Sequence, residues 1–266
     1  MQIQFPTKFE IEYPPENGRY YNYNRSRRIL TGCLLQKSRG FCMYCGKTLV
    51  HDGDLIFHME HSVDKAGNEN QTKDEKTFLT HCKFNFSVAC VKCNEQCKKQ
   101  VEKIDISEAD KEINCLSKKC EEMCPEYIAA RNLYIEKNAI ILQPQGYTNE
   151  GIEYGINYNL LKHIYEPNIE NKNPKEYFFI QNHIERFRLN NKRFSYGVID
   201  VAVKVINFYE NGVHEMSGIF SCLFEDKVEN IMEYIFIDYL KTYFEQGNVK
   251  ELVEFCELLV LLDAVN

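Results

Sequence analysis

Two Cys-x-x-Cys pairs are the residues of this chain best suited to hold a metal ion. Cys42 and Cys45 form the first pair, and Cys90 and Cys93 form the second. Each turn of this spacing can direct two sulfurs at one ion, and two turns complete the tetrahedral thiolate set that structural Zn²⁺ prefers. Buried free thiols are the alternative, because Cys is often buried without a ligand. We therefore predict a structural zinc site closed by these four residues.

Between and just after these pairs lie residues that could hydrolyse a phosphodiester bond. They are Glu60, His61, Asn85 and Asn94. An imidazole has an unperturbed pKa of about 6.5, so it can accept a proton from water near neutral pH. Carboxylate and amide oxygens are the hard ligands that Mg²⁺ or Mn²⁺ prefers. The set predicts a second, catalytic metal beside a general base.

The order of these residues resembles that of the HNH (ββα-metal) endonucleases. The match covers about residues 40–100, roughly a quarter of the chain, and rests on Cys42-x-x-Cys45, Glu60-His61, Asn85 placed before Cys90, and Cys93-Asn94. The resemblance implies that His61 activates water, that Glu60 and Asn94 hold the catalytic metal, and that Asn85 orients the strand of His61. Asn94 departs from the final His of the family, which favours Mg²⁺ over softer ions.

His58 adds a third candidate ligand and an alternative enzyme class. On a strand it shares a face with Glu60, so it is a candidate metal or supporting group. His58-x-Glu60 followed by Cys90-x-x-Cys93 also resembles the signature of zinc-dependent nucleobase deaminases. That alternative leaves the first cysteine pair and both asparagines without a role.

A non-enzymatic alternative is a zinc-knuckle module that binds nucleic acid or acts as a scaffold. It explains the four cysteines but assigns no use to Glu60 and His61. A substitution at His61 distinguishes the two classes, since a binding module should tolerate it.

Basic residues near these motifs are candidate phosphate contacts. Arg27 and Arg28 project from a predicted helix over residues 25–39, and Lys65, Lys98 and Lys99 lie close to the motifs. Phosphate contacts from such side chains position a protein on nucleic acid. The alternative interpretation of this helix is that its basic residues simply face solvent and contact no phosphate.

Charge is divided unevenly along the chain. Residues 1–104 hold 16 Lys and Arg against 12 Asp and Glu, a net charge of +4, and the remaining residues hold 16 against 27, a net charge of −11. The basic part contains the motifs, so we predict DNA as the substrate, and RNA stays open because the phosphate chemistry is shared. The acidic part is a poor phosphate surface and is expected to contact protein.

The predicted fold class is α+β. Residues 1–39 form an N-terminal arm and basic helix, residues 40–104 form a small zinc-stapled ββα-metal core, and residues 105–266 form a mainly helical module for regulation or partner binding. Within the core, a hairpin at residues 49–57 precedes a loop over 62–78 and a helix over 94–106. Apolar residues at helical spacing predict helices over 176–210 and 226–262. Residues 249–262 are apolar nearly all round and are expected to be buried core, with a partner interface as the alternative.

A weaker resemblance concerns the partner. Residues 184–191 followed by a helix are similar to the tail of HNH subunits in Septu-type and retron-linked anti-phage systems, which implies a nuclease held by an ATPase subunit. Cys115, Cys120 and Cys124 could bind further zinc, but their spacing favours packing in a helix core.

Composition places the chain among globular proteins without a membrane span. Apolar residues make up 44% of it, and no apolar run is long enough to cross a bilayer. The N-terminal sequence lacks the basic and apolar regions of a secretory signal. The 12 cysteines are therefore expected to be cytoplasmic thiols and metal ligands.

Overall fold

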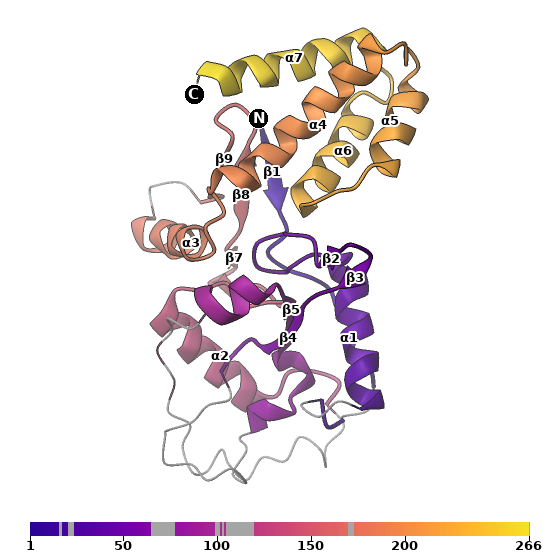
Figure 1. Cartoon of the computed structure of the whole chain (residues 1–266). Coiled ribbons are helices and arrows are strands. Elements are labelled where there is room, and N and C mark those ends of the chain that lie inside the picture. Colours follow the sequence, from indigo (N-terminus) through magenta and orange to yellow (C-terminus); the bar gives the residue numbers. More distant parts are fainter. Residues whose placement is uncertain are drawn as a thin grey trace.

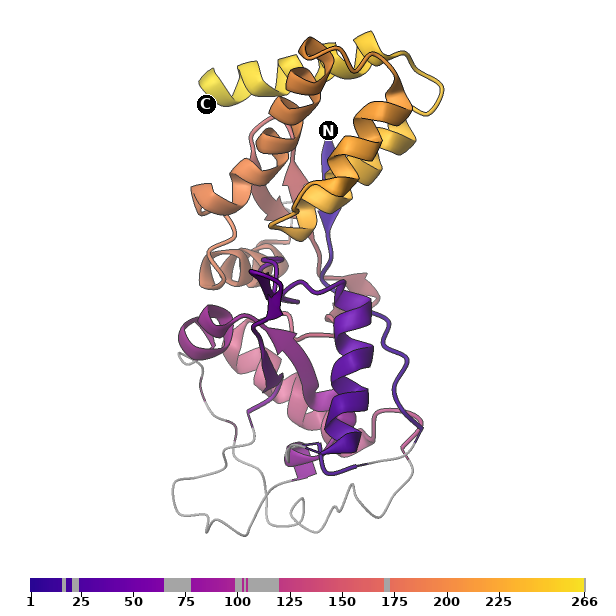
Figure 2. The ribbon, with the colours of Figure 1, turned by 45° about the vertical axis from the view of Figure 1, so that its right-hand side comes forward.

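The structure is a computed structural model that describes residues 1–15, 18–20, 24–64, 78–98, 102, 104, 120–169 and 173–265, without the side chains of 192–196. Two lobes lie one above the other (Figures 1 and 2). The lower lobe contains α1, β4, β5 and α2, and the upper lobe contains a three-stranded sheet and the helices α4–α7. The predicted α+β class is confirmed.

The predicted N-terminal arm begins with a strand that pairs with distant parts of the chain. Strand β1 (Gln2–Phe5) pairs antiparallel with β8 (Ile156–Asn159), which pairs in turn with β9 (Ile164–Pro167). Ile3 and Phe5 point into the core while Gln2 and Gln4 are exposed, as the two-residue period of a strand requires. The first residues of the chain are thereby joined to the upper lobe.

Helix α1 (Arg25–Ser38) agrees with the predicted helix. The side chain of Asn24 caps it by accepting a hydrogen bond from the backbone N–H of Arg27 at 3.0 Å. Leu30 and Leu34 are fully buried and face β5. This packing places α1 along one face of the strands that carry the motifs.

A short hairpin and a second antiparallel strand pair follow α1. The predicted hairpin at residues 49–57 is confirmed by the antiparallel pairing of β2 (Val50–His51) with β3 (Asp54–Leu55). Its two turn residues, Asp52 and Gly53, both have positive φ, at 52° and 87°, as a tight hairpin turn requires. Strands β4 (His58–His61) and β5 (Phe86–Ala89) pair antiparallel, with His58 opposite Ala89 and His61 opposite Phe86. The 3₁₀ helices Phe78–Thr80 and Lys83–Asn85 lead into β5, and the π-helix Cys93–Cys97 follows it. The predicted helix over 94–106 therefore starts earlier, and most of its second half lies outside the described residues.

The rest of the chain is mainly helical. Its elements are α2 (Pro125–Asn138), the hairpin β6 (Thr148–Asn149) and β7 (Ile152–Glu153), α3 (Pro174–Arg186), α4 (Lys192–Glu210), α5 (Met216–Glu225), α6 (Ile231–Tyr243) and α7 (Val249–Val265). The two ranges predicted to be helical, 176–210 and 226–262, are mainly helical, but each is divided into two separate helices. Arg188 has a φ of 55°, and the N–H of Leu189 bonds to the carbonyl of Ile184, which ends the first helix. In the second range, α6 ends at Tyr243 and α7 begins at Val249.

Helix α7 is buried on one face only. Leu252, Cys256 and Leu259 are fully buried, whereas Leu258 and Leu261 are 50% and 64% exposed. The prediction that residues 249–262 are buried core therefore holds for one face of the helix, and the exposed face keeps the alternative of a partner interface open. Within the described residues, no helix is both long and apolar enough to cross a membrane.

The two lobes are connected through the first cysteine turn. The backbone N–H of Thr48 donates to the carbonyl of Glu229 at 2.8 Å, and that of Ile231 donates to the carbonyl of Gly46 at 2.8 Å. The buried apolar residues form one continuous cluster across both lobes. The cysteine turn is thus fixed against the start of α6.

Candidate metal centre and the strands beside it

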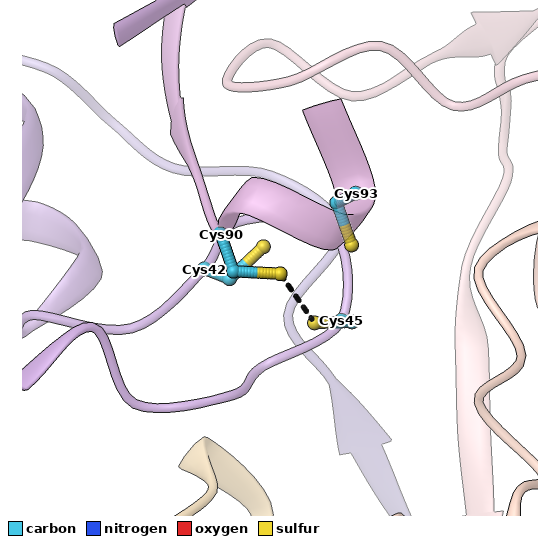
Figure 3. A group of neighbouring side chains, drawn as sticks. All are labelled: Cys42, Cys45, Cys90 and Cys93. Atoms are coloured by element: carbon cyan, nitrogen blue, oxygen red, sulfur yellow. Dashed lines mark hydrogen bonds between the residues drawn. The ribbon is translucent and has the colours of Figure 1, made fainter. Parts of the chain in front are cut away.

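The four cysteines converge as their spacing predicts. Figure 3 shows the cluster, whose sulfur atoms all lie within 4.8 Å of one another, with Cys45 Sγ 3.8 Å from Cys90 Sγ. Sulfurs bound to Zn²⁺ at about 2.3 Å in a tetrahedron are about 3.8 Å apart, so the cluster fits that ion. Cys90 is the most exposed of the four, at 9%. The cluster could therefore hold a structural metal such as zinc.

A glycine makes the first turn of the cluster possible. Gly46 has a φ of 72°, and its N–H donates to the carbonyl of Cys42 at 2.8 Å. A Cβ at this position would lie 2.6 Å from Cγ2 of Ile231. The second turn runs into the π-helix, where the N–H of Asn94 donates to the carbonyl of Cys90 at 3.1 Å.

Proximity changes the protonation of the thiols. Hydrogen bonds among the sulfurs, first from Cys42, raise the pKa of Cys45 and Cys93 and lower the pKa of Cys90. The four groups thus compete for protons. A divalent cation among them would favour the thiolate form of each, which is how metal binding releases protons.

The strand carrying the other motif residues presents two different faces. Side chains alternate along β4, so His58 and Glu60 share one face and Met59 and His61 share the other. The second face is turned toward α1, where the hydroxyl of Thr31 lies 3.3 Å from the sulfur of Met59. The predicted base and the predicted metal ligand therefore lie on opposite sides of the strand pair.

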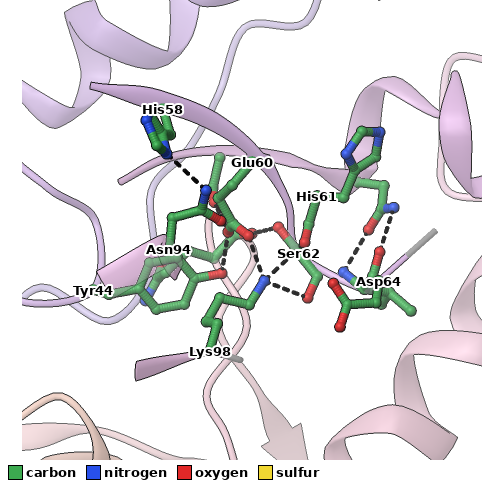
Figure 4. Close-up of polar contacts among 12 residues, drawn as sticks. Tyr44, His58, Glu60, His61, Ser62, Asp64, Asn94 and Lys98 are labelled. Atoms are coloured by element: carbon green, nitrogen blue, oxygen red, sulfur yellow. Dashed lines mark hydrogen bonds and ion pairs between the residues drawn. The ribbon is translucent and has the colours of Figure 1, made fainter. Parts of the chain in front are cut away.

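Glu60 belongs to a buried polar network (Figure 4). One carboxylate oxygen accepts hydrogen bonds from Ser87 and, at 2.6 Å, from the hydroxyl of Tyr44. The other oxygen pairs with the ammonium group of Lys98. Burial, then the charge of Glu60, raises the pKa of Tyr44. Both oxygens are already engaged, so this arrangement does not fit Glu60 as a ligand for Mg²⁺ or Mn²⁺.

Lys98 lies inside the protein rather than at its surface. Its side chain is 4% exposed, and its ammonium group also donates to the carbonyls of His61 and Ser62 at 2.8 and 3.0 Å. The predicted phosphate contact of Lys98 is therefore wrong: its charge is used to neutralise Glu60 and to hold the end of β4.

Asn94 lies beside His58. The amide Nδ2 of Asn94 is 2.8 Å from Nδ1 of His58 (Figure 4), and Oε1 of Glu95 is 3.9 Å from the same nitrogen. His58 and Glu95 are 35% and 49% exposed. The structure thus joins Asn94 with His58, and not with Glu60.

His61 is held by its surroundings on the α1 side. Its ring centroid is 4.4 Å from that of Phe86, and Nε2 is 3.2 Å from the carbonyl oxygen of Thr80. On the adjacent α1, Arg28 is exposed and Arg27 is half-buried. Two predicted phosphate contacts thus lie on the helix that covers the face of His61.

Asn85 is fully buried and ties together the chain around this strand. Its Oδ1 accepts from the N–H of Val63 at 2.7 Å, and its Nδ2 donates to the carbonyls of Val63 and Leu79 at 2.9 and 3.1 Å. The segment that follows His61 is therefore fixed by one side chain.

Other predicted residues lie apart from this site. Lys65, Lys99 and Cys115 are outside the described residues. Cys120 and Cys124 precede α2 instead of packing within a helix, and Cys124 Sγ accepts from the N–H of Tyr127 at 3.4 Å. The four-cysteine cluster is the one group of three or more Cys, His or acidic ligands found in the described part of the chain.

Three residues of this site could not be recognised from the sequence. Tyr44, Ser87 and Thr80 act through contacts that depend on strand register and on the fold of the intervening loop. Ser87 becomes predictable once β4 and β5 are paired, because it lies opposite Glu60.

Comparison with known proteins adds no family to this description. No protein-family model, no curated protein and no solved structure matches the chain. Inference about function therefore depends on the residues themselves.

Proposed function

We propose that this protein is an endonuclease of the HNH type that hydrolyses DNA phosphodiester bonds, with His61 as the general base. The setting of His61 carries the proposal. A carbonyl oxygen only accepts hydrogen bonds, so the contact with Thr80 makes Nε2 of His61 the donor. As a general base, His61 would take the proton from water through its other ring nitrogen, Nδ1.

The surrounding chain supports the positioning that such a base needs. Asn85 fixes the segment after His61, and Lys98 holds the carbonyl of His61 itself. The cysteine cluster connects the turn before β4 to the turn after β5. A catalytic group held by rigid elements retains its geometry during attack.

Phosphate contacts are proposed for the α1 side of the strands. Arg28 is exposed there and Arg27 is half-buried. The guanidinium group of an arginine can donate two hydrogen bonds to phosphate oxygens. Such contacts would orient the nucleic-acid backbone without recognising its base sequence. Lys65 and Lys99 stay predictions for the same role.

A divalent metal, Mg²⁺ or Mn²⁺, remains part of the proposal because the resemblance implies it. The engaged oxygens of Glu60 do not support the predicted ligand pair of Glu60 and Asn94. No catalytic step is therefore assigned to a metal at Glu60.

A protein partner is proposed for the acidic helical part, as an ATPase subunit in an anti-phage system would require. The net charge of −11 in this part supports a protein contact over a phosphate contact. Leu258, Leu261 and Val265, spaced by three and four residues on α7, leave an exposed apolar stripe. Binding there would regulate a nuclease whose cutting residues lie in the other lobe.

The alternatives differ in what they require of the same residues. A zinc-knuckle binding module needs only the cysteines and the basic helix. A deaminase needs His58, Cys90 and Cys93 on one zinc, whereas both cysteines share a cluster with Cys42 and Cys45. The nuclease proposal is preferred because it also uses His61 and Asn85.

Nicking of supercoiled plasmid tests the proposal. Zinc-loaded protein is incubated with Mg²⁺ or Mn²⁺, beside His61→Ala and the control His214→Ala, whose ring lies in the upper lobe against Tyr209. Cleavage by the wild type and the control, but not by His61→Ala, is expected. Equal cleavage by all three proteins would refute the role of His61. Binding of plasmid without cleavage, unchanged in His61→Ala, would favour the binding module.

A further inference from the structure

We propose that a cavity between the two lobes binds a nucleoside monophosphate whose base carries an amino group. The cavity has a volume of about 690 Å³, which is within the range of small-molecule sites, and such sites often form where two parts of a protein meet. The proposal goes beyond the proposed function, because this ligand is bound rather than cut, at residues to which no part in cleavage is assigned.

Both lobes contribute to the wall of the cavity. The two cysteine turns supply Lys47 and Lys92 from the lower lobe, and α4 and α6 supply Asp200 and Glu233 from the upper lobe. Backbone hydrogen bonds join the first cysteine turn to the start of α6, so the two walls are held together without a ligand. Such preorganisation reduces the ordering cost of binding.

Glu233 offers the cavity a buried hydrogen-bond acceptor. The residue is 7% exposed, its Oε2 accepts from the N–H of Glu229 at 3.1 Å, and its Oε1 has no hydrogen-bond partner within the described residues. Lys204 on α4 pairs with Asp226 at 2.8 Å instead of neutralising this carboxylate. Burial raises the pKa of Glu233 to about 7, so an N–H donor brought by a ligand would stabilise its ionised form.

The rest of the upper wall is also suited to a donor. Asp200 and Glu229 line it and are exposed, beside Lys204 and Lys227. Carboxylates accept hydrogen bonds and do not donate them when ionised. The amino group of adenine, cytosine or guanine is a donor of the kind that this wall requires.

The lower wall is suited to an anion. Lys47 is half-buried and Lys92 is exposed, and neither forms an ion pair with another described residue. His51 lies on the same wall. The cysteines that border it are at most 9% exposed, so the two ammonium groups are the more accessible charges. Hydrogen bonds from ammonium groups to phosphate oxygens are charge-assisted and strong.

Apolar side chains complete the lining. Ile56, Val91 and Val203 line the cavity and are 49%, 38% and 37% exposed. Exposed apolar groups gathered in a groove are typical of a ligand site, and the face of a nucleobase would cover them. A phosphate for the lower wall, a flat base for these side chains and an amino group for Glu233 together describe a nucleotide.

Isothermal titration calorimetry of the zinc-loaded protein tests this site. The ligands are adenosine monophosphate and guanosine monophosphate, beside inosine monophosphate, which lacks the amino group of both. We expect at least one of the first two to bind with one molecule per chain. Inosine monophosphate and ribose 5-phosphate should bind at least about tenfold more weakly, because each lacks a group that the cavity contacts.

Substitutions assign the two ends of the ligand. Lys47→Met should weaken binding of each nucleotide by about tenfold, and Lys92→Met repeats this test at an exposed position. Glu233→Met should remove the preference over inosine monophosphate, because the acceptor of the amino group is lost. Lys162→Met changes a lysine that is 64% exposed and does not line the cavity, so binding should be unchanged. Circular dichroism verifies that each variant is folded.

Three results would overturn the proposal. They are an absence of binding by both amino nucleotides, equal affinity for inosine monophosphate, and binding that survives in both Lys47→Met and Lys92→Met. Loss of binding in Arg28→Ala, with the lysine variants unaffected, would place the nucleotide beside His61 and would also contradict it. Because the readout is binding of a small ligand, it is independent of the nicking assay. An inactive protein that binds the nucleotide would refute only the proposed function.

Discussion

Replacement of Lys98 by Met should destabilise the protein strongly. The side chains of Lys98 and Glu60 are 4% and 2% exposed, so the substitution leaves a carboxylate buried without a counter-ion. Removing one partner of a buried ion pair typically costs about 3–5 kcal/mol. The carbonyls of His61 and Ser62 also lose a donor. We therefore expect the free energy of unfolding to fall by about 4 kcal/mol.

A double variant separates the ion pair from simple packing. Lys98→Met combined with Glu60→Gln removes the uncompensated charge, while the amide oxygen can still accept from Tyr44 and Ser87. We expect the double variant to regain about 2 kcal/mol relative to Lys98→Met alone. Lys92→Met is the matched control. Lys92 is exposed, so this change should alter stability by no more than about 0.5 kcal/mol.

Urea titration at pH 7 with saturating zinc, followed by circular dichroism, measures these differences. A decrease of less than about 1 kcal/mol in the free energy of unfolding of Lys98→Met would refute the reasoning, because a charge left buried without a partner destabilises a protein by more than this. Additivity of the two single substitutions in the double variant would also refute it, since contacting residues should couple.

Four further substitutions and the removal of zinc have expected outcomes. Asn85→Ala should lower the free energy of unfolding by about 3 kcal/mol in urea titrations and reduce nicking, because three backbone groups lose their buried partner. Gly46→Ala should lower the melting temperature and the zinc content together, since a Cβ would lie 2.6 Å from Ile231 at a φ of 72°. Cys90→Ser should reduce the metal measured by mass spectrometry from about one zinc ion per chain, and a chelator should unfold the wild type at a lower temperature. Burial raises the pKa of Glu233 to about 7 from 4.5, so its ionisation lowers stability as pH rises between these values, and Glu233→Gln should match the wild type at pH 4 but exceed it by about 3 kcal/mol at pH 8. A stability difference that does not change with pH would contradict the last expectation.

Local geometry explains what the sequence predicted correctly. The cysteine cluster follows from two short turns, each of which fixes two sulfurs. The hairpin at Asp52 and Gly53 and the capped helix α1 are likewise set by neighbouring residues. Each of these features depends on fewer than about a dozen residues at a time, so the pattern alone suffices.

Long-range partners explain what the sequence could not predict. The role of Lys98 depends on Glu60, which is 38 residues away, so the sequence alone favours a phosphate contact for this lysine. The strand formed by residues 2–5 has a partner more than 150 residues away. The turn between α3 and α4 contains no Gly or Pro that would signal it in the sequence. Arg188 itself adopts the left-handed conformation there.

The alternation of β4 was partly visible in the sequence, and its consequence was not. Because side chains alternate along a strand, the neighbouring residues Glu60 and His61 must point to opposite faces of β4. The resemblance nevertheless implied a single site containing both residues. The packing of α1 on one face and of Lys98 on the other separates them.

Chemical rescue of His61→Gly by imidazole tests the central claim most directly. If the ring of His61 removes a proton from water, the variant should lack plasmid nicking and regain it as free imidazole is added, with a pH dependence that follows the added base. The wild type and His214→Ala should not respond to imidazole. Full nicking by His61→Gly without imidazole would contradict the account.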